Sequence, residues 1–282
     1  TEVVGMGEAP ATAIRRKKDS SIARAISLVK EGDADAVFSA GNTGAAVAAS
    51  TLKLRTLEGV SRPAIATVIP TSKNPYVLLD AGANPDSTPE MLQQLAVMGS
   101  IYSREFWGDS SPRAGLLSIG EEAAKGNETT KKGFGLLEQA RLQFVGNVES
   151  RDLFSGKVDV AVCDGFVGNI VLKACESLSK LIGSFLDEEL RRNALRKTGA
   201  LLSKGAFRSL KQRINPEQFG GAPLLGLTKN VIKAHGSSNR NHVSGAIKIA
   251  LDLVQHDMIT QVLDDVHEAN EILRPEPLLN RD

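Results

Sequence analysis

The stretch Val158-Asp-Val-Ala-Val-Cys-Asp-Gly-Phe-Val-Gly-Asn-Ile-Val-Leu-Lys173 decides the fold class of this chain. It opens with a short apolar, β-branched run at 158–163, the kind of run that forms a strand covered on both faces. A glycine-containing turn follows, and a helical pattern continues from Gly168 to Arg192. A buried strand that passes through a tight turn into a helix is the unit from which parallel α/β sheets are built.

The turn between this strand and this helix is a candidate anion site. Free N–H groups at the start of a helix attract anions, and glycine lets the backbone approach a ligand closely. Gly168 and Asn169 occupy that position, and Lys173 follows about one helical turn later. The Lys173 ammonium would neutralise a bound phosphate there, whereas the alternative is an ordinary exposed helix lysine.

The same design occurs earlier, in Ser39-Ala-Gly-Asn-Thr-Gly-Ala45. Gly41 and Gly44 would admit a ligand close to the backbone, while Asn42 and Thr43 add side-chain donors. The segment has neither the Gly-Lys-Ser/Thr of a Walker loop nor the GxGxxG of dinucleotide-binding folds. It is either a phosphate-binding turn or a small-residue turn that Asn42 or Thr43 caps.

Short apolar runs alternate with helical patterns up to residue 192. We expect strands at 35–40, 64–70, 76–81, 113–119, 142–148 and 158–163. We expect helices at 20–31, 43–55, 89–103, 129–140 and 168–192. This order predicts a single α/β domain over 1–282, with a doubly wound, mainly parallel sheet and flanking helices.

Two details complete the expected fold. Pro70 and Pro75 predict a tight connection within 68–76, between two neighbouring strands that pair antiparallel. After Arg192 the strand pattern stops, which predicts a helical C-terminal part with helices near 200–214, 238–255 and 260–273.

Other polar side chains follow the ends of predicted strands. Asn84 follows the strand at 76–81, and Glu121 and Glu122 follow the strand at 113–119. Ligands of open α/β sheets bind at these carboxyl ends, although such residues also serve as helix caps. His235 precedes another helix start, where it is either an acid–base group or a loop histidine that bonds locally.

The composition excludes several classes of protein. The 282 residues carry a formal net charge of +1, which argues against a dedicated nucleic-acid binder. No apolar run approaches the roughly 20 residues of a membrane span. Cys163 and Cys175 fit neither a disulfide framework nor a metal site, and they indicate a reducing cytoplasm. Cys163 before its glycine turn is a rival candidate nucleophile, although a buried cysteine is usually a small hydrophobe.

Segment 191–215 predicts a basic amphipathic helical insertion. Its candidate surface residues are Arg191, Arg192, Arg196, Lys197, Leu202, Phe207 and Leu210. Such a helix lies on an anionic membrane, or its apolar face packs on the core or on a second subunit.

Taken together, several strings resemble the phosphate acyltransferase family. They are SAGNTGA, LLDAGAN, SIGEEAAKGNE, FVGNVESRDLFSGKVDVAVCDGFVGNIVLK, GGAPLLGL and IKAHGSSN, and they follow the order of that family. The resemblance implies a fold like that of the isocitrate/isopropylmalate dehydrogenase and phosphotransacetylase group. It implies transfer of a long acyl chain from acyl carrier protein to orthophosphate, for bacterial phospholipid synthesis. It further implies a cytoplasmic, loosely membrane-associated homodimer without cofactor or metal.

One departure from the family concerns the start of the chain. The family normally opens with a strand that carries Asp-x-Met-Gly-Gly-Asp, and nothing in this sequence matches it. We therefore expect the numbering to begin inside a longer protein.

The implied mechanism assigns roles to the candidate residues. Phosphate attacks the thioester directly, so the protein must hold phosphate and stabilise an oxyanion. The phosphate-binding residues would be Gly41, Asn42, Thr43, Gly44 and Gly168. The catalytic residues would be Lys173, Asn169, His235 and Asn84. The basic segment would meet the carrier protein or the membrane, and a membrane glycerol-phosphate acyltransferase is a further expected partner. The alternatives are an acetyl-type phosphotransacylase that uses coenzyme A, and a phosphate- or nucleotide-binding module without catalysis.

Overall fold

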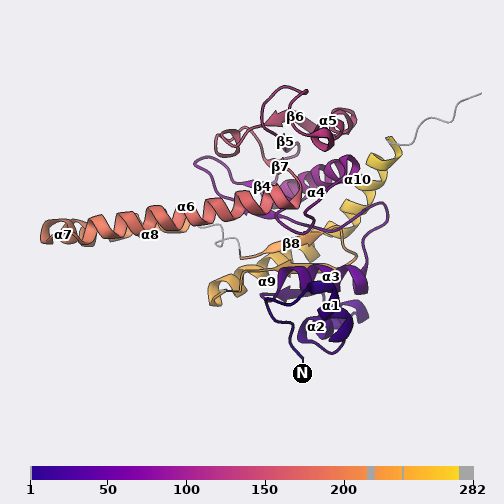
Figure 1. Cartoon of the computed structure of the whole chain (residues 1–282), viewed down its shortest axis with the longest axis horizontal. Coiled ribbons are helices and arrows are strands. Elements are labelled where there is room, and N and C mark those ends of the chain that lie inside the picture. Colours follow the sequence, from indigo (N-terminus) through magenta and orange to yellow (C-terminus); the bar gives the residue numbers. More distant parts are fainter. Residues whose placement is uncertain (1, 215–219, 237, 273–282) are drawn as a thin grey trace, which may run out of the picture.

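The strands of the molecule form two sheets (Figure 1). The computed structural model describes residues 2–214, 220–236 and 238–272. The five-stranded sheet has the order β3 (Thr67–Ile69), β4 (Tyr76–Leu79), β7 (Val160–Val162), β5 (Arg113–Leu117) and β6 (Gln143–Val148). The four-stranded sheet has the order β1 (Ala36–Ser39), β9 (Asn230–Lys233), β8 (Ala222–Leu225) and β2 (Ala64–Ile65).

Parallel pairing dominates the five-stranded sheet. β4, β7, β5 and β6 run parallel to one another, and β3 pairs antiparallel with β4 as Pro70 and Pro75 predict. In the four-stranded sheet β1 and β9 are parallel, while β8 is antiparallel to both β9 and β2. The expected α/β class with a mainly parallel sheet is confirmed, but its strands are divided between two sheets.

Helices cover both sheets. α4 (Pro89–Trp107) lies against β4, β5 and β7, with α5 (Glu128–Gln139) and α10 (Met258–Ile272) beside it. Thr88 caps the start of α4 by accepting from the Met91 N–H, and Gly108 ends it in the left-handed conformation. Around the four-stranded sheet lie α2 (Ser21–Glu31), α3 (Thr43–Leu54) and α9 (Arg240–Gln255), and α1 (Pro10–Arg16) packs on α3.

The expected strand at 64–70 is two strands that belong to different sheets. β2 pairs with β8, and β3 pairs with β4, so the chain changes sheet at Ala66. The Ala66 N–H donates to the carbonyl of Pro223 at 3.0 Å, which anchors the crossing point. This short stretch therefore ties the two sheets directly together.

The prediction that no strand follows Arg192 is wrong, because β8 and β9 form a hairpin there. Each strand has four residues, and Gly226 in the intervening turn has φ 84°. These strands were missed because such short runs beside glycine and proline do not stand out from a loop by periodicity.

Three helices form an arm that leaves the body of the molecule (Figure 1). α6 (Gly165–Arg191) starts in the body and runs outward, α7 (Ala194–Leu202) lies at its far end, and α8 (Lys204–Ile214) follows. The expected helix at 200–214 is broken at Ser203, which caps α7. Within the part of the chain that the structure describes, no helix is long and apolar enough to cross a membrane.

Candidate functional site

A cavity of about 380 Å³ lies where strand ends of the two sheets meet. The five-stranded sheet contributes Ala81 and Gly82, just after β4, and the four-stranded sheet contributes Lys233 at the end of β9. The other lining residues with polar side chains are Thr43, Thr67, Asn169, Lys173, Glu176, His235, Ser238 and His242. We call this space the inter-sheet cavity.

Lys233 is one of the residues of this cavity that the sequence analysis did not single out. Its side chain is buried, with the whole residue only 7% exposed, and its ammonium donates to the carbonyl of Ala234. Among the described residues no carboxylate forms an ion pair with it, and burial alone lowers the pKa of Lys233 to about 8. Val231 and Ile232 precede it as buried strand residues, so the signal was a lysine that closes an apolar run.

Of the four residues predicted to bind phosphate at the first turn, Thr43 alone lines the cavity. Asn42 caps α3, because its Oδ1 accepts from the Ala45 N–H at 3.0 Å. Its Nδ2 donates to the carbonyls of Gly5 and Met6 at 3.2 and 3.1 Å. Asn42 therefore holds the N-terminal loop against α3 with both ends of its amide.

The two glycines of this turn differ. A Cβ at Gly44 would lie 2.5 Å from Cγ of Pro10, so its small size lets α1 approach α3. At Gly41 a Cβ would meet only Ser39 Oγ, at 3.6 Å, and the Gly41 N–H already donates to that hydroxyl.

Asn84 lies beside the cavity as part of a buried turn. Its Nδ2 donates to the carbonyl of Pro63 at 2.7 Å and to Asp80 Oδ2 at 2.9 Å. Asp80 also accepts from the N–H groups of Ile65, Gly82 and Ala83. Burial raises the pKa of Asp80, and these donors oppose that rise. The turn after β4 is thus shaped by Asp80, and Asn84 braces it.

The second predicted turn brings α6 to the cavity. A Cβ at Gly168 would lie 1.9 Å from the carbonyl oxygen of Asp80, so the helix start touches the turn after β4 backbone to backbone. The Gly168 N–H is used inside the helix, where it donates to the carbonyl of Asp164 at 3.0 Å. Asn169 and Lys173 both line the cavity, and Lys173 is exposed.

The two histidines come from the loop after β9 and from α9. His235 is exposed and follows Lys233 by two residues. His242 sits in the first turn of α9, where its Nδ1 accepts from the Asn239 N–H at 3.0 Å. Asn239 in turn caps the helix, since its Oδ1 accepts from the N–H groups of Asn241 and His242.

The charges of the inter-sheet cavity favour an anion. Lys173 and Lys233 line it and Glu176 is its one lining carboxylate among the described residues. α3 begins at Thr43 and α9 begins just beyond Ser238, so two helix N-termini with their positive ends also lie at its wall. In the same described ranges, no three His, Cys, Asp or Glu side chains gather as a metal site.

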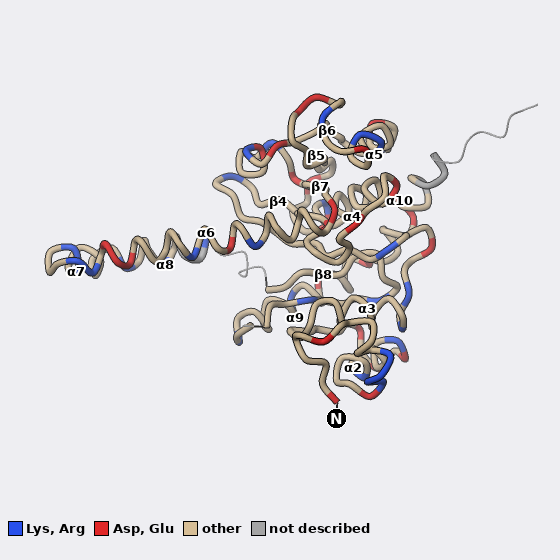
Figure 2. The backbone as a smooth tube through the Cα atoms, in the orientation of Figure 1, with Lys and Arg blue, Asp and Glu red and all other residues tan. Residues whose placement is uncertain are grey.

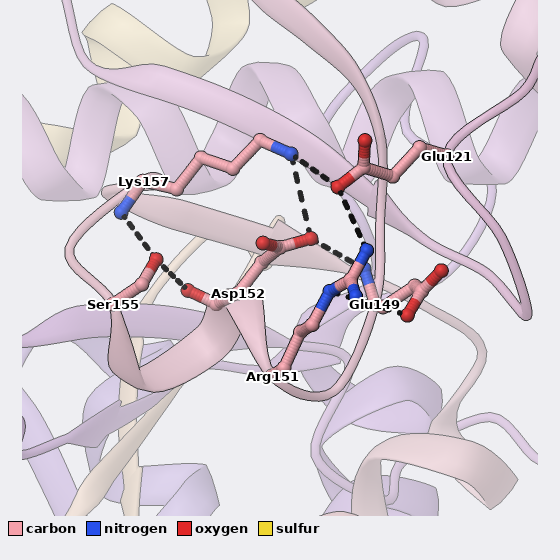
Figure 3. Close-up of polar contacts among 6 residues, drawn as sticks. All are labelled: Glu121, Glu149, Arg151, Asp152, Ser155 and Lys157. Atoms are coloured by element: carbon pink, nitrogen blue, oxygen red, sulfur yellow. Dashed lines mark hydrogen bonds and ion pairs between the residues drawn. The ribbon is translucent and has the colours of Figure 1, made fainter.

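Two further candidates lie outside the cavity. Cys163 is 3% exposed, and burial, aided by the charges of Asp164 and Asp80, raises the pKa of its thiol. Glu121 belongs to a surface network (Figure 3), where its Oε1 accepts from Lys157 at 3.1 Å and Arg151 at 3.4 Å. That network joins the loops that follow β5 and β6.

The predicted surface residues lie on the arm. Figure 2 shows acidic as well as basic positions along it. Arg191 pairs with Asp187 at 2.8 Å, and Arg192 and Arg196 both pair with Glu189. The segment alone has no acid, but its arginines face the acids at the end of α6, so its effective charge is smaller than the sequence indicates.

The apolar residues of the arm do not share the single face that the sequence predicted. Phe207 and Leu210 of α8, with Lys197 of α7, line a groove of about 850 Å³ against α6. Leu202 lies on the other side of the break at Ser203 and is 84% exposed. The break separates the two groups, because it interrupts the helical repeat that would have aligned them.

Solved structures with a similar fold include phosphotransacylases. A branched-chain phosphotransacylase from Enterococcus faecalis V583 has a TM-score of 0.53 at 16% identity, over 83% of this chain and 79% of that chain. A phosphotransacetylase from Staphylococcus aureus has a TM-score of 0.50 at 17% identity, over 84% of this chain and 65% of that chain. The fold is therefore that of the phosphotransacylase class, as expected.

The sequence identifies the family within that class. The model of the family described as "Fatty acid synthesis protein" matches residues 1–261. The phosphate acyltransferase of Pelotomaculum thermopropionicum is 48% identical over 265 residues, which are 94% of this chain and 78% of the relative. That of Desulfitobacterium hafniense is 49% identical over 263 residues, 93% of this chain and 79% of the relative. The chain belongs to the phosphate acyltransferase family of enzymes.

Proposed function

We propose that this enzyme transfers a long acyl chain from acyl carrier protein to orthophosphate and so forms an acyl phosphate. The observation that carries the proposal is the lining of the inter-sheet cavity, where two lysines and two helix N-termini outnumber the one carboxylate among the described residues, Glu176. Such a cavity suits a small dianion such as phosphate. The support for acyl transfer as the reaction comes from membership in the family.

The reaction needs little covalent chemistry from the protein. A phosphate oxygen attacks the thioester carbonyl, the C–O bond forms, and the C–S bond breaks as the thiolate leaves and takes up a proton. The protein must hold phosphate at the carbonyl and stabilise the oxyanion that develops. We assign charge stabilisation to Lys173, substrate orientation to Thr43 and Asn169, and protonation of the thiolate to His235.

The turns of the cavity support these roles in part. The backbone of Gly41 and Gly44 remains a proposed contact for phosphate, although Asn42 is fully engaged in capping and bracing. Gly168 and Asn84 have a positioning role. They hold the start of α6 against the turn after β4, so that Asn169 lies beside Gly82.

The arm is the proposed docking surface of the carrier protein. Arg191, Arg192, Arg196 and Lys197 lie at its far end, and an acidic carrier would be attracted through long-range steering. Because Asp187 and Glu189 already pair with the three arginines, the attraction is modest and falls with salt. Charge reversal at Arg192 and Arg196 should raise the KM for the carrier-bound donor at low salt, with kcat unchanged.

The apolar residues of the arm support a homodimer and a membrane contact at different places. Along its shaft Leu178, Ile182 and Phe185 are each more than half exposed, and a second copy would bury them. At the tip Leu195, Leu201 and Leu202 are 83%, 69% and 84% exposed, which suits a cytoplasmic enzyme that touches lipid loosely. A membrane glycerol-phosphate acyltransferase would then receive the labile product nearby.

The test is direct detection of the acyl phosphate. Purified protein, palmitoyl–carrier protein and phosphate are incubated, and hydroxylamine traps the product as a hydroxamate. Hydroxylamine also reacts slowly with the thioester itself, so a reaction without protein gives the background. The proposal predicts hydroxamate above this background that depends on phosphate and falls to the background when sulfate replaces it. A preference for short acyl-coenzyme A would instead indicate an acetyl-type phosphotransacylase. Phosphate binding without any hydroxamate would indicate a non-catalytic module.

A further inference from the structure

We propose that orthophosphate binds against the side-chain amine of Lys233, and that this amine takes up a proton when the phosphate binds. The inference rests on the proposed function, which it deepens by naming the cation of the phosphate site. Lys233 ends β9, and its backbone is held beside Ser39 at the end of β1. Lys233 thus lines one wall of the inter-sheet cavity, and its ammonium donates to the carbonyl of Ala234 beside it.

The burial of Lys233 is costly without an anion. A charged group removed from water destabilises the protein unless an opposite charge or several hydrogen bonds compensate it. Within the described part of the chain, the Lys233 ammonium has one hydrogen-bond partner, the carbonyl of Ala234, which carries no net charge. Exposed lysines such as Lys229, on the same hairpin, bear no such cost. A bound dianion would supply the missing charge.

The burial of Lys233 also explains why a proton is taken up when phosphate binds. Because burial lowers the pKa of Lys233 to about 8, its amine is uncharged in about half of the phosphate-free molecules at that pH. A dianion at the amine favours the charged form, so binding draws in a proton. Above pH 8 the affinity for phosphate should therefore fall by about tenfold per pH unit.

Other titratable groups line the same cavity, and their effects on phosphate binding must be distinguished from the effect of Lys233. Lys173 and Glu176 come from α6, His235 from the loop after β9 and His242 from α9. Substitution of Lys173 should weaken phosphate binding through lost attraction, yet leave the pH dependence in place. Substitution of Lys233 should remove the pH dependence itself.

The experiment is calorimetric titration of inorganic phosphate between about pH 8 and about pH 9.5, in buffers of different ionisation enthalpy. We expect wild-type protein to take up protons, and Lys233→Met to lose roughly 30-fold or more in affinity. Lys233→Arg should bind phosphate with no pH dependence, because a guanidinium stays protonated over this range. Lys173→Met should keep the wild-type pH dependence, and Lys229→Met should match wild type fully.

Folding and function are monitored separately. Thermal unfolding without phosphate should show Lys233→Met at least as stable as wild type, since a buried charge is removed. If that variant does not fold, the flat pH profile of Lys233→Arg still decides the matter. Wild-type affinity or wild-type proton uptake in a folded Lys233→Met protein would overturn the inference, as would a wild-type protein that binds no phosphate.

The same variants distinguish this inference from the proposed function. If phosphate binding depends on Lys233 but no hydroxamate forms with any acyl donor, the site stands and the proposed acyl transfer fails. If Lys233→Met forms hydroxamate with the wild-type KM for phosphate, the acyl transfer stands and the Lys233 site is wrong.

Discussion

Gly168 and Asp80 meet so closely that a Cβ atom on Gly168 would lie 1.9 Å from the Asp80 carbonyl oxygen. This contact joins the start of α6 to the turn after β4, and both segments line the inter-sheet cavity. A side chain at residue 168 would have to displace backbone rather than a flexible neighbour. The contact therefore sets how closely the start of α6 approaches the turn after β4.

Gly168→Ala should therefore destabilise the protein by about 1 to 3 kcal/mol or more, because overpacking shifts backbone. Gly135→Ala in α5 is the matched control, since nothing lies within 4 Å of a Cβ there. That control should be neutral or stabilising by about 0.5 kcal/mol. Urea unfolding measures both. An unchanged midpoint for Gly168→Ala would mean that the contact relaxes freely.

Lys173→Ala should reduce turnover on the order of 100-fold, because it removes the cation proposed to stabilise the charge of the reacting phosphate. Lys173 is exposed, so the fold should be unaffected. Steady-state rates of hydroxamate formation measure the change. Lys248→Ala, at an exposed lysine of α9, controls for a general loss of charge. Wild-type turnover in the folded Lys173→Ala protein would remove this residue from the mechanism.

Cys163→Ala should retain turnover, because phosphate attacks the thioester without an acyl-cysteine. The thiol is 3% exposed and its pKa is raised by burial and by the neighbouring carboxylates, which disfavours a thiolate nucleophile. Mass spectrometry of protein quenched with acyl donor in the absence of phosphate gives an independent answer. A stable acyl adduct on Cys163 would contradict direct attack.

Asp159 should make the stability of the protein sensitive to acid. Burial pushes its pKa up, but the guanidinium and N–H of Arg113, at 2.8 and 2.9 Å, outweigh burial and hold the pKa below its ordinary value. A carboxyl group with a depressed folded-state pKa contributes stability above its unfolded pKa of about 3.9 and loses it as pH falls through the folded value.

Asp159→Asn should lower the free energy of unfolding by about 2 kcal/mol at neutral pH and by less below about pH 3. Asp19→Asn is the control, because the Asp19–Arg24 pair is well exposed and worth little. Thermal unfolding across the acidic range measures both variants. Parallel pH profiles for wild type and Asp159→Asn would show that the pair does not couple to acid stability.

The tip of the arm should mediate lipid contact. Leu201→Glu together with Leu202→Glu should release the protein from anionic vesicles while turnover of a donor in solution is unchanged. Leu52→Glu, at an exposed leucine of α3, should remain bound. Co-sedimentation with vesicles and a sizing column measure the two effects. If the tip variant dissociates or aggregates, the leucines form a protein contact and the lipid proposal is wrong.

The sequence predicts local units well, because each strand–turn–helix unit is encoded within about twenty residues. The turns at Gly41 and Gly168, and the antiparallel pair of strands on either side of Pro70, were found in this way. The sequence could not show which strands pair with one another in the sheets. Residues 64–69 form one apolar run, yet they serve two sheets, and Ala36 pairs with Asn230 far along the chain.

The candidate site shows the same limit. Asn42 and Asn84 offered donors in the sequence, but the acceptors that occupy them lie in distant loops. Lys233 remained hidden for the opposite reason. Its importance comes from burial, which depends on the packing of β9 between β1 and β8 rather than on any local pattern.

The order in which the strands are synthesised gives the two-sheet arrangement a consequence for the growing polypeptide. The five-stranded sheet has all its strands once Val162 has left the ribosome, whereas β1 and β2 wait for Ala222–Leu225 and Asn230–Lys233. Until then β1 and β2 of the nascent chain have no partner strands, and unpaired strand edges promote aggregation or chaperone binding. A product that stops before residue 222 would lack β8 and β9, and with them Lys233 and one wall of the inter-sheet cavity.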